Sequence, residues 1–467
     1  MTKLRKMLQH PRPAPAVKDA EQIRRDYPRW RRKVMTGMLC GYALFYFVRK
    51  NFSMANKPLS EAFGFSNTEM GAILSTATIV YAFSKFFSGV LADRMNARYL
   101  MGIGLILSAL MNFAFGFSPV ISTALGIGSP LALFIVFWAI SNLFQGTGVP
   151  PCSKTLTYWY APKESGTAWG IWNSSHQIGG AIILIMAGYL VANFGWQSAF
   201  YVPAVFGLLG GFLIIYCMRD TPQSVGMPSV EVYHSKYKGD ADEEFHEEAI
   251  ESEEEQPPFW DNFKEHILTN PMIWLVCVGN FFVYIVRISV LDWGPRFLQE
   301  SKGFSEEASG FAASGFELSG VLGAFAAGWF SDKIYKGRRG PVMVLFMLAL
   351  AGCVYGLLVV GEGRQWTIAW ILIALGFFVY GPQMLVAVAA ADFATKKAAA
   401  TAVGLTGFFG YAGATISGIG TGMIVDQFGW NGAFMSFIGA TLIGAFIFMF
   451  TWNKRSPVLD GLHSEDE

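Results

Sequence analysis

The feature that most constrains this chain is a series of apolar segments, each long enough to cross a lipid bilayer. A membrane-spanning helix needs about 20 consecutive apolar residues. Twelve such segments occur, in two sets of six that flank a long polar stretch. Only 15% of the 467 residues are charged, whereas 53% are hydrophobic. The pattern predicts an all-α membrane protein with twelve transmembrane helices and excludes an ordinary water-soluble enzyme.

The apolar segments divide the chain into two six-helix halves with polar segments around them. We expect spans at about 34–56, 68–92, 98–118, 131–153, 165–192 and 195–218, and then at about 272–294, 308–331, 341–360, 366–390, 399–425 and 430–452. The predicted domains are a basic head (1–33), an N-terminal half (34–218), an acidic linker (219–270), a C-terminal half (271–453) and a tail (454–467).

The placement of positive charge predicts the topology. Alternate loops on the side of the N-terminus carry 27 Lys or Arg, eleven of them in the head, whereas the opposite side carries four. Cytoplasmic loops of membrane proteins are enriched in Lys and Arg. We therefore expect both termini and the linker in the cytoplasm, in a multi-pass protein of a bacterial inner membrane.

The two halves repeat each other in sequence. Gly89 and Gly328 lie 239 residues apart near the ends of the second spans of the two halves, and the triplet Phe-Gly-Trp at 194–196 returns at 428–430. Chance similarity of apolar helices does not explain such regular spacing. Two six-helix halves in parallel repeat resemble the plan of the major facilitator transporters. In the loop after the second span of each half, we expect Asp93, Arg94 and Asp332 to act in conformational gating.

Four cations fall inside predicted spans: Arg49, Lys50, Lys85 and Arg287. Each costs about 2.5–3.5 kcal/mol at the centre of a membrane helix on insertion scales, so such residues usually face a polar cavity. Arg49 and Arg287 are 238 residues apart, so they occupy equivalent places in the two halves. A guanidinium fork matches phosphate or carboxylate oxygens. We predict that both arginines bind one anion, best a phosphate.

Structural roles remain open for these cations. Arg49 and Arg287 could instead pair with an acid within the membrane, either Glu317 or Asp292. Lys50 lies one helical step away from Arg49, and Glu317 is an alternative partner for it.

Polar aromatic residues accompany the cations at helical spacing. Tyr42, Tyr46 and Arg49 share one helix face, because they stand at positions i, i+4 and i+7. Packing or an interfacial position is the alternative for any single ring. Of six histidines only His176 lies in a span, where an ionisable residue is a functional candidate. The further members of the predicted cavity lining are Tyr81, Trp172, Asn173 and Tyr284.

Signatures of soluble catalysis are missing from the sequence. Nucleotide-binding glycine loops, the H-E-x-x-H zinc motif and the G-x-S-x-G nucleophile motif do not occur. The five cysteines contain no C-x-x-C pair, which argues against a metal site. We expect no enzyme activity, no cofactor, no metal and no nucleic-acid partner.

Several segments resemble one family, the organophosphate:phosphate antiporters, across about residues 30–453. The similar segments are 41–52 (GYALFYFVRKNF), 81–86 (YAFSKF), 172–176 (WNSSH) with Gly179 and Gly180, 284–287 (YIVR), 380–382 (YGP) and 410–411 (GY). The chain departs from the family pattern at Gln177, where the family usually has Asn, and at Val149, where glycerol-3-phosphate transporters carry Trp.

The resemblance implies a sugar-phosphate carrier that exchanges its substrate for inorganic phosphate. The smaller Val149 leaves room for a hexose 6-phosphate such as glucose 6-phosphate; glycerol 3-phosphate exchange, or a membrane sensor of sugar phosphate with a cytosolic signalling partner, are the alternatives. We expect a monomer in the bilayer. By this resemblance Arg49, Arg287, Lys85 and His176 bind the phosphate, and Tyr42, Tyr46, Lys50, Tyr81, Val149, Trp172, Asn173, Tyr284, Tyr380 and Tyr411 line the cavity.

Overall fold

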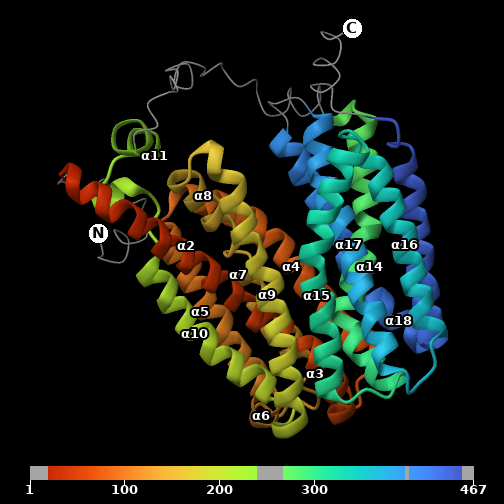
Figure 1. The fold of residues 1–467 in the computed structure, drawn as a ribbon. Coiled ribbons are helices and arrows are strands. Elements are labelled where there is room, and N and C mark those ends of the chain that lie inside the picture. The colour runs from red at the N-terminus through yellow and green to blue at the C-terminus, as the bar shows by residue number, and fades with distance from the viewer. Residues whose placement is uncertain (1–18, 239–266, 395–398, 455–467) are drawn as a thin grey trace. The chain divides into compact units, whose positions relative to one another are not determined.

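The computed structural model describes residues 19–238, 267–394 and 399–454, and helices are the only regular secondary structure in these ranges. The chain divides into two compact units (Figure 1). The first contains the described residues of 1–51, 80–180 and 200–254. The second contains those of 52–79, 181–199 and 255–467.

The first unit is built around α2 (Ala20–Lys50), which packs against α5, α7 and α8. Its core includes residues that precede the first predicted span. Tyr27 stacks on Tyr233 with ring centroids 3.8 Å apart and also contacts Trp159. The start of the linker therefore packs on α2. The other elements are α5 (Ala97–Gly116), α6 (Ser118–Ala124), α7 (Leu131–Gln145), α8 (Val149–Trp159), α10 (Ser198–Cys217), η1 (Pro222–Val225), α11 (Val230–Tyr233) and η2 (His234–Lys238).

The second unit is a helical bundle in which α14 packs against α18, and α15 against α17 (Figure 1). Two long helices, α4 (Asn67–Arg94) and α9 (Pro162–Phe194), contribute one end to each unit. The remaining elements of this unit are α3 (Phe52–Phe63), α14 (Pro271–Ser301), α15 (Glu306–Trp329), η4 (Phe330–Ile334), α16 (Arg339–Val359), α17 (Gln365–Phe393) and α18 (Ala399–Met449).

Ten described helices are long and apolar enough to cross a membrane. One of them, α18, contains the last two predicted spans. The backbone leaves helical geometry at Gly429, and this break divides α18 into two helical segments. The first predicted span falls in α2 and α3. Helix α2 begins at Ala20, well before the predicted boundary at 34, where the Asp19 side chain accepts a hydrogen bond from the Gln22 amide and caps the helix.

The repeated Phe-Gly-Trp triplet has the same backbone turn in both places. Gly195 has φ of 80° and Gly429 has φ of 66°, a left-handed conformation that favours glycine. The Ala-Phe pairs that follow, at 199–200 and 433–434, are buried in both copies. Glycine therefore recurs in this triplet because each copy turns the chain sharply between two helices.

One end of the second unit is joined by polar contacts between distant segments. The Asp426 carboxylate of α18 accepts hydrogen bonds from the backbone and side chains of Asn67 and Thr68, at 2.6–3.1 Å, and so caps α4. Arg296 lies inside α14 rather than in the loop that the sequence predicts, and donates to Asn56 and Ser60 of α3. We call the four hydrogen bonds that Asp426 accepts from Asn67 and Thr68 the Asp426 cap.

Candidate functional site

In the first unit, Tyr42, Tyr46 and Arg49 of α2 contact residues of α4 and α9. The guanidinium carbon of Arg49 lies 3.8 Å from the ring centroid of Tyr81 on α4 and 5.7 Å from that of Tyr46. A cation over an aromatic face is attracted by the ring's electron density. Arg49 is therefore positioned by two of the predicted lining tyrosines.

Helix α9 brings its aromatic residues to the same face of α2. The ring centroid of Trp172 lies 5.0 Å from that of Tyr42, and His176 lies 5.6 Å from Tyr46. Trp172 is buried, His176 half-buried and Asn173 exposed. The structure thus groups His176, Trp172, Tyr42, Tyr46, Tyr81 and Arg49 in one unit.

The remaining sequence-predicted residues of this unit lie close to that group. Lys85 is half-buried four residues after Tyr81 on α4, and Lys50 is buried at the end of α2. Val149 opens α8 and packs against the core cluster that contains Tyr42. At Gly148 a Cβ would meet the Tyr42 ring at 2.9 Å, so the turn before Val149 lies directly against this tyrosine.

In the second unit, Arg287 is held by a hydrogen-bonded chain. Its Nη2 donates to the Tyr380 hydroxyl at 3.0 Å, and that hydroxyl donates to Oε2 of Glu317 at 2.7 Å. All three side chains are buried, with exposed fractions of 7%, 3% and 0%. A buried carboxylate is costly unless it is hydrogen-bonded or paired. This chain couples Glu317 to the arginine that we expect to bind the substrate.

Two further tyrosines lie beside Arg287. The guanidinium carbon lies 5.7 Å from the ring centroid of Tyr284, which contacts the ring of Tyr411 at 5.8 Å. The structure therefore brings Arg287, Tyr284, Tyr380 and Tyr411 together, and their role as a cavity lining stays a prediction. The convergence of Arg49 and Arg287 on one anion stays a prediction, because they lie in different units.

Sequence reasoning did not place Glu317 in the binding site, although it named this residue as a possible partner of an arginine or of Lys50. Its connection to Arg287 runs through the phenol of Tyr380, from a third helix. The sequence feature that could have indicated its role is an acidic residue in the middle of an apolar span. Glu317 joins the candidate site on this geometry.

Among the predicted gating residues, Asp332 forms an ion pair with Arg339, which also contacts Asp392 at 3.0 Å. Arg94 is exposed at the end of α4. The side chain of Asp93 lies outside the described part of the chain. Gating by these residues stays a prediction.

The chain matches the family model described as Major Facilitator Superfamily over residues 38–418 and 295–466. The fold is similar to the crystal structure of a bacterial homologue of the human lysosomal transporter Spinster, with a TM-score of 0.72 and 15% sequence identity, over 90% of this chain and 97% of that one. This likeness supports the helical architecture alone.

Named relatives cover almost the whole chain. A probable hexose phosphate transport protein of Chlamydia pneumoniae is 40% identical, over 96% of this chain and 97% of the relative. The glycerol-3-phosphate transporter of Bacillus subtilis is 39% identical, over 95% and 97%. The membrane sensor protein UhpC of Escherichia coli is 34% identical, over 96% and 98%. The chain belongs to the organophosphate:phosphate antiporter family of the major facilitator superfamily, a family of membrane transporters rather than enzymes.

Proposed function

We propose that the protein exchanges a hexose 6-phosphate, with glucose 6-phosphate as the expected substrate, for inorganic phosphate across a bacterial inner membrane. The observation that carries the proposal is that each unit fixes one arginine within a membrane helix among tyrosines. Arg49 packs on Tyr81, and Arg287 bonds to Tyr380. Two guanidiniums can bind the oxygens of one phosphate through charge-assisted hydrogen bonds.

The mechanism follows from the charges of the site. Two arginines that face an empty cavity repel each other, so closing the halves without an anion is disfavoured. Either a sugar phosphate or inorganic phosphate removes that repulsion. A ligand that favours closure shifts the equilibrium toward the state that changes access. We therefore expect obligatory exchange.

The orientation is proposed from the charge bias of the loops, which places both termini and the linker in the cytoplasm. In this orientation the basic first half of α2 lies on the cytosolic side of the membrane. The carrier would then take up sugar phosphate from outside in exchange for cytosolic phosphate.

The decisive experiment is uptake of labelled glucose 6-phosphate into proteoliposomes of the purified protein, loaded with phosphate or free of it. We expect uptake only with internal phosphate, and weaker competition by glycerol 3-phosphate than by unlabelled glucose 6-phosphate. Uptake into phosphate-free vesicles would contradict obligatory exchange. Binding without uptake in either vesicle would favour a sensor, the role that the name of the Escherichia coli relative gives to that protein.

Val149 tests the substrate. It packs beside the cluster that contains Tyr42, so Val149→Trp adds an indole next to the predicted cavity. Overpacking of this kind typically costs about 1–3 kcal/mol, so we expect glucose 6-phosphate exchange to fall roughly 10- to 100-fold. Glycerol 3-phosphate exchange should fall less, and an unchanged preference measured by competition would argue against a role for Val149 in selectivity.

A further inference from the structure

Two helices of the first unit, α2 and α10, lie side by side (Figure 1) and pack closely. A Cβ atom at Gly37 would lie only 2.6 Å from that of Cys217, so the glycine lets the two helices approach. About one turn beyond this contact, aromatic and positively charged side chains of both helices meet. We call these four residues the boundary cluster: Trp30 and Lys33 of α2, Tyr216 of α10 and Arg219, which follows α10.

The boundary cluster alternates rings and cations. The Lys33 ammonium lies 3.8 Å from the ring centroid of Tyr216 and 4.8 Å from that of Trp30. The guanidinium carbon of Arg219 lies 5.2 Å from the same Trp30 ring. A ring face attracts a cation without accepting a conventional hydrogen bond from it. The Lys33 ammonium therefore keeps N–H donors for a ligand while the two rings hold it in place.

The positive charge of the cluster is not neutralised by a carboxylate. Within the described ranges neither Lys33 nor Arg219 forms an ion pair. Burial, and next to it repulsion by Arg98 at the start of α5, lower the pKa of the Arg219 guanidinium. Asp220 offsets part of this repulsion, but its Oδ2 also lies 3.6 Å from Nζ of Lys154. Cations held this close together favour a bound anion.

The cluster lies at the predicted edge of the bilayer. The first span is predicted to begin at 34 and the sixth to end at 218, so Lys33 and Arg219 directly flank these spans on the same side of the membrane. Trp and Tyr are enriched at membrane interfaces, and Lys and Arg extend their charged ends to the headgroups. In the proposed orientation this is the cytosolic leaflet, whose surface carries anionic lipids.

An exposed apolar stripe on α10 leads away from the cluster into the predicted span. Leu209, Phe212 and Tyr216 follow one another at intervals of three and four residues, so they share one helix face. Their exposed fractions are 62%, 64% and 67%. An acyl chain that lies along this face would bring the phosphate of its own lipid to the boundary cluster.

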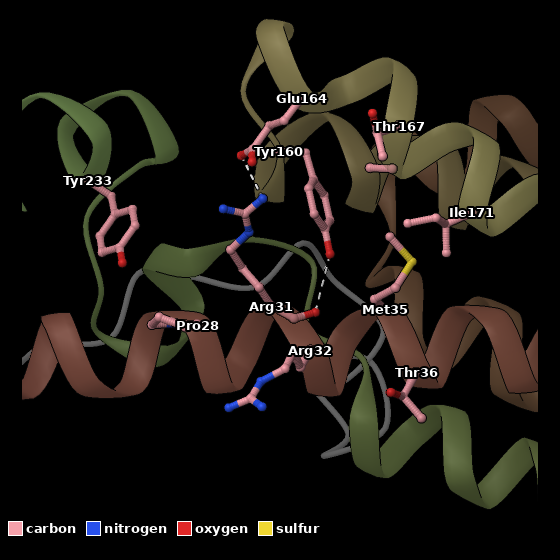
Figure 2. Close-up of a pocket in the computed structure, with 11 residues that line it drawn as sticks. Pro28, Arg31, Arg32, Met35, Thr36, Tyr160, Glu164, Thr167, Ile171 and Tyr233 are labelled. Atoms are coloured by element: carbon pink, nitrogen blue, oxygen red, sulfur yellow. Dashed lines mark hydrogen bonds and ion pairs between the residues drawn. The ribbon is translucent and has the colours of Figure 1, made fainter. Parts of the chain in front are cut away.

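The neighbouring arginines of α2 belong to a different environment. Figure 2 shows Arg31 paired with Glu164, with 2.6 Å between Nη2 and Oε1, at a cavity that Arg32 also lines. The charge of Arg31 is therefore already balanced. Lys33 is not among the described residues that line this cavity. Arg32 thus provides a control, because it is a cation next to Lys33 in sequence but outside the boundary cluster.

We propose that the boundary cluster binds the phosphate of an anionic phospholipid, such as phosphatidylglycerol, with an acyl chain along Leu209 and Phe212. Lys33 and Arg219 bind the phosphate oxygens, and Trp30 and Tyr216 hold the two cations at the depth of the headgroup. Such a lipid bridges α2 and α10 at one end of the first unit. The site does not depend on which anion the protein transports.

The experiment measures binding of phosphatidylglycerol to the purified full-length protein by native mass spectrometry, with phosphatidylcholine of the same acyl chains as the comparison. We expect tighter binding of phosphatidylglycerol. Lys33→Gln should weaken this binding about fivefold, which corresponds to roughly 1 kcal/mol for one cation near an anionic surface. Arg32→Gln should weaken it less. Lys33→Arg keeps the charge and should restore binding, which separates the loss of charge from misfolding.

Four outcomes overturn the proposal. Equal binding of the two lipids means that the cluster does not select an anionic headgroup. Equal weakening by Lys33→Gln and Arg32→Gln means that diffuse surface charge attracts the lipid. Displacement by inorganic phosphate as effective as that by a second phosphatidylglycerol assigns the cluster to free phosphate. Equal binding of dihexanoyl and long-chain phosphatidylglycerol contradicts the place of the acyl chain on α10.

Discussion

The two arginines that we expect to share one substrate are fixed by different interactions. Arg49 packs over the ring faces of Tyr81 and Tyr46. Arg287 donates a hydrogen bond to Tyr380, whose hydroxyl donates in turn to the buried Glu317. Sequence repetition thus preserves the cation in each half but changes what holds it.

The difference has an electrostatic consequence. A contact with a ring face orients a guanidinium without using its N–H donors. A hydrogen bond to a phenol uses one donor, and a nearby carboxylate offsets part of the positive charge. We infer that the bond to Tyr380 and the nearby Glu317 carboxylate fix how the fork of Arg287 faces the substrate phosphate.

The harshest test of this comparison is to replace each arginine by lysine. Arg49→Lys and Arg287→Lys both keep the charge but remove the planar fork. Loss of a buried charged hydrogen-bond pair costs about 2–5 kcal/mol, so exchange should fall at least roughly 30-fold in either variant. Initial rates in proteoliposomes measure this, with Arg29→Lys on the exposed part of α2 as the control. Full activity in either variant would refute a shared anion site.

A smaller effect is expected from Tyr380→Phe, which leaves the ring in place and removes the hydroxyl between Arg287 and Glu317. Hydrogen bonds to charged groups contribute about 1.5–3 kcal/mol, so exchange should fall roughly 10- to 100-fold. The control is Tyr355→Phe, an exposed tyrosine on α16. Equal rates for the two variants would show that the hydroxyl bridge does not position Arg287.

The smallest effect is expected on the Arg49 side. Tyr81→Phe keeps the ring face under Arg49, whereas Tyr81→Leu removes it. A cation–π contact contributes about 0.5–2 kcal/mol, so Tyr81→Leu should reduce exchange roughly 2- to 30-fold and Tyr81→Phe much less. Measuring the KM for phosphate in both variants, from initial exchange rates, checks this difference between the ring and the hydroxyl. A larger loss in Tyr81→Phe would mean that the hydroxyl, and not the ring, is the functional group.

Helical spacing was enough to predict which residues share one face of α2. Tyr42, Tyr46 and Arg49 fall on one face at a period of 3.6 residues, and the structure groups them with Trp172 and His176. Spacing could not predict the Arg287–Tyr380–Glu317 chain, because its members come from α14, α17 and α15 and meet only in the folded bundle.

The ends of elements were harder to predict than the elements themselves. The sequence places the first span at 34, because the preceding residues are basic, but α2 starts at Ala20. Packing explains the difference: Ile23 and Tyr27 are buried against the start of the linker, so tertiary contacts extend the helix beyond its apolar stretch. Three residues of this extension, Pro28, Arg31 and Arg32, line a cavity of about 590 Å³. No sequence motif predicts this cavity.

The Asp426 cap makes a single residue responsible for four hydrogen bonds between α18 and the beginning of α4. An ionised carboxylate only accepts hydrogen bonds, so the four donors of Asn67 and Thr68 lose their acceptor together if Asp426 is replaced by an apolar residue. This contact between two segments far apart in the sequence is therefore made or lost as a whole rather than one bond at a time.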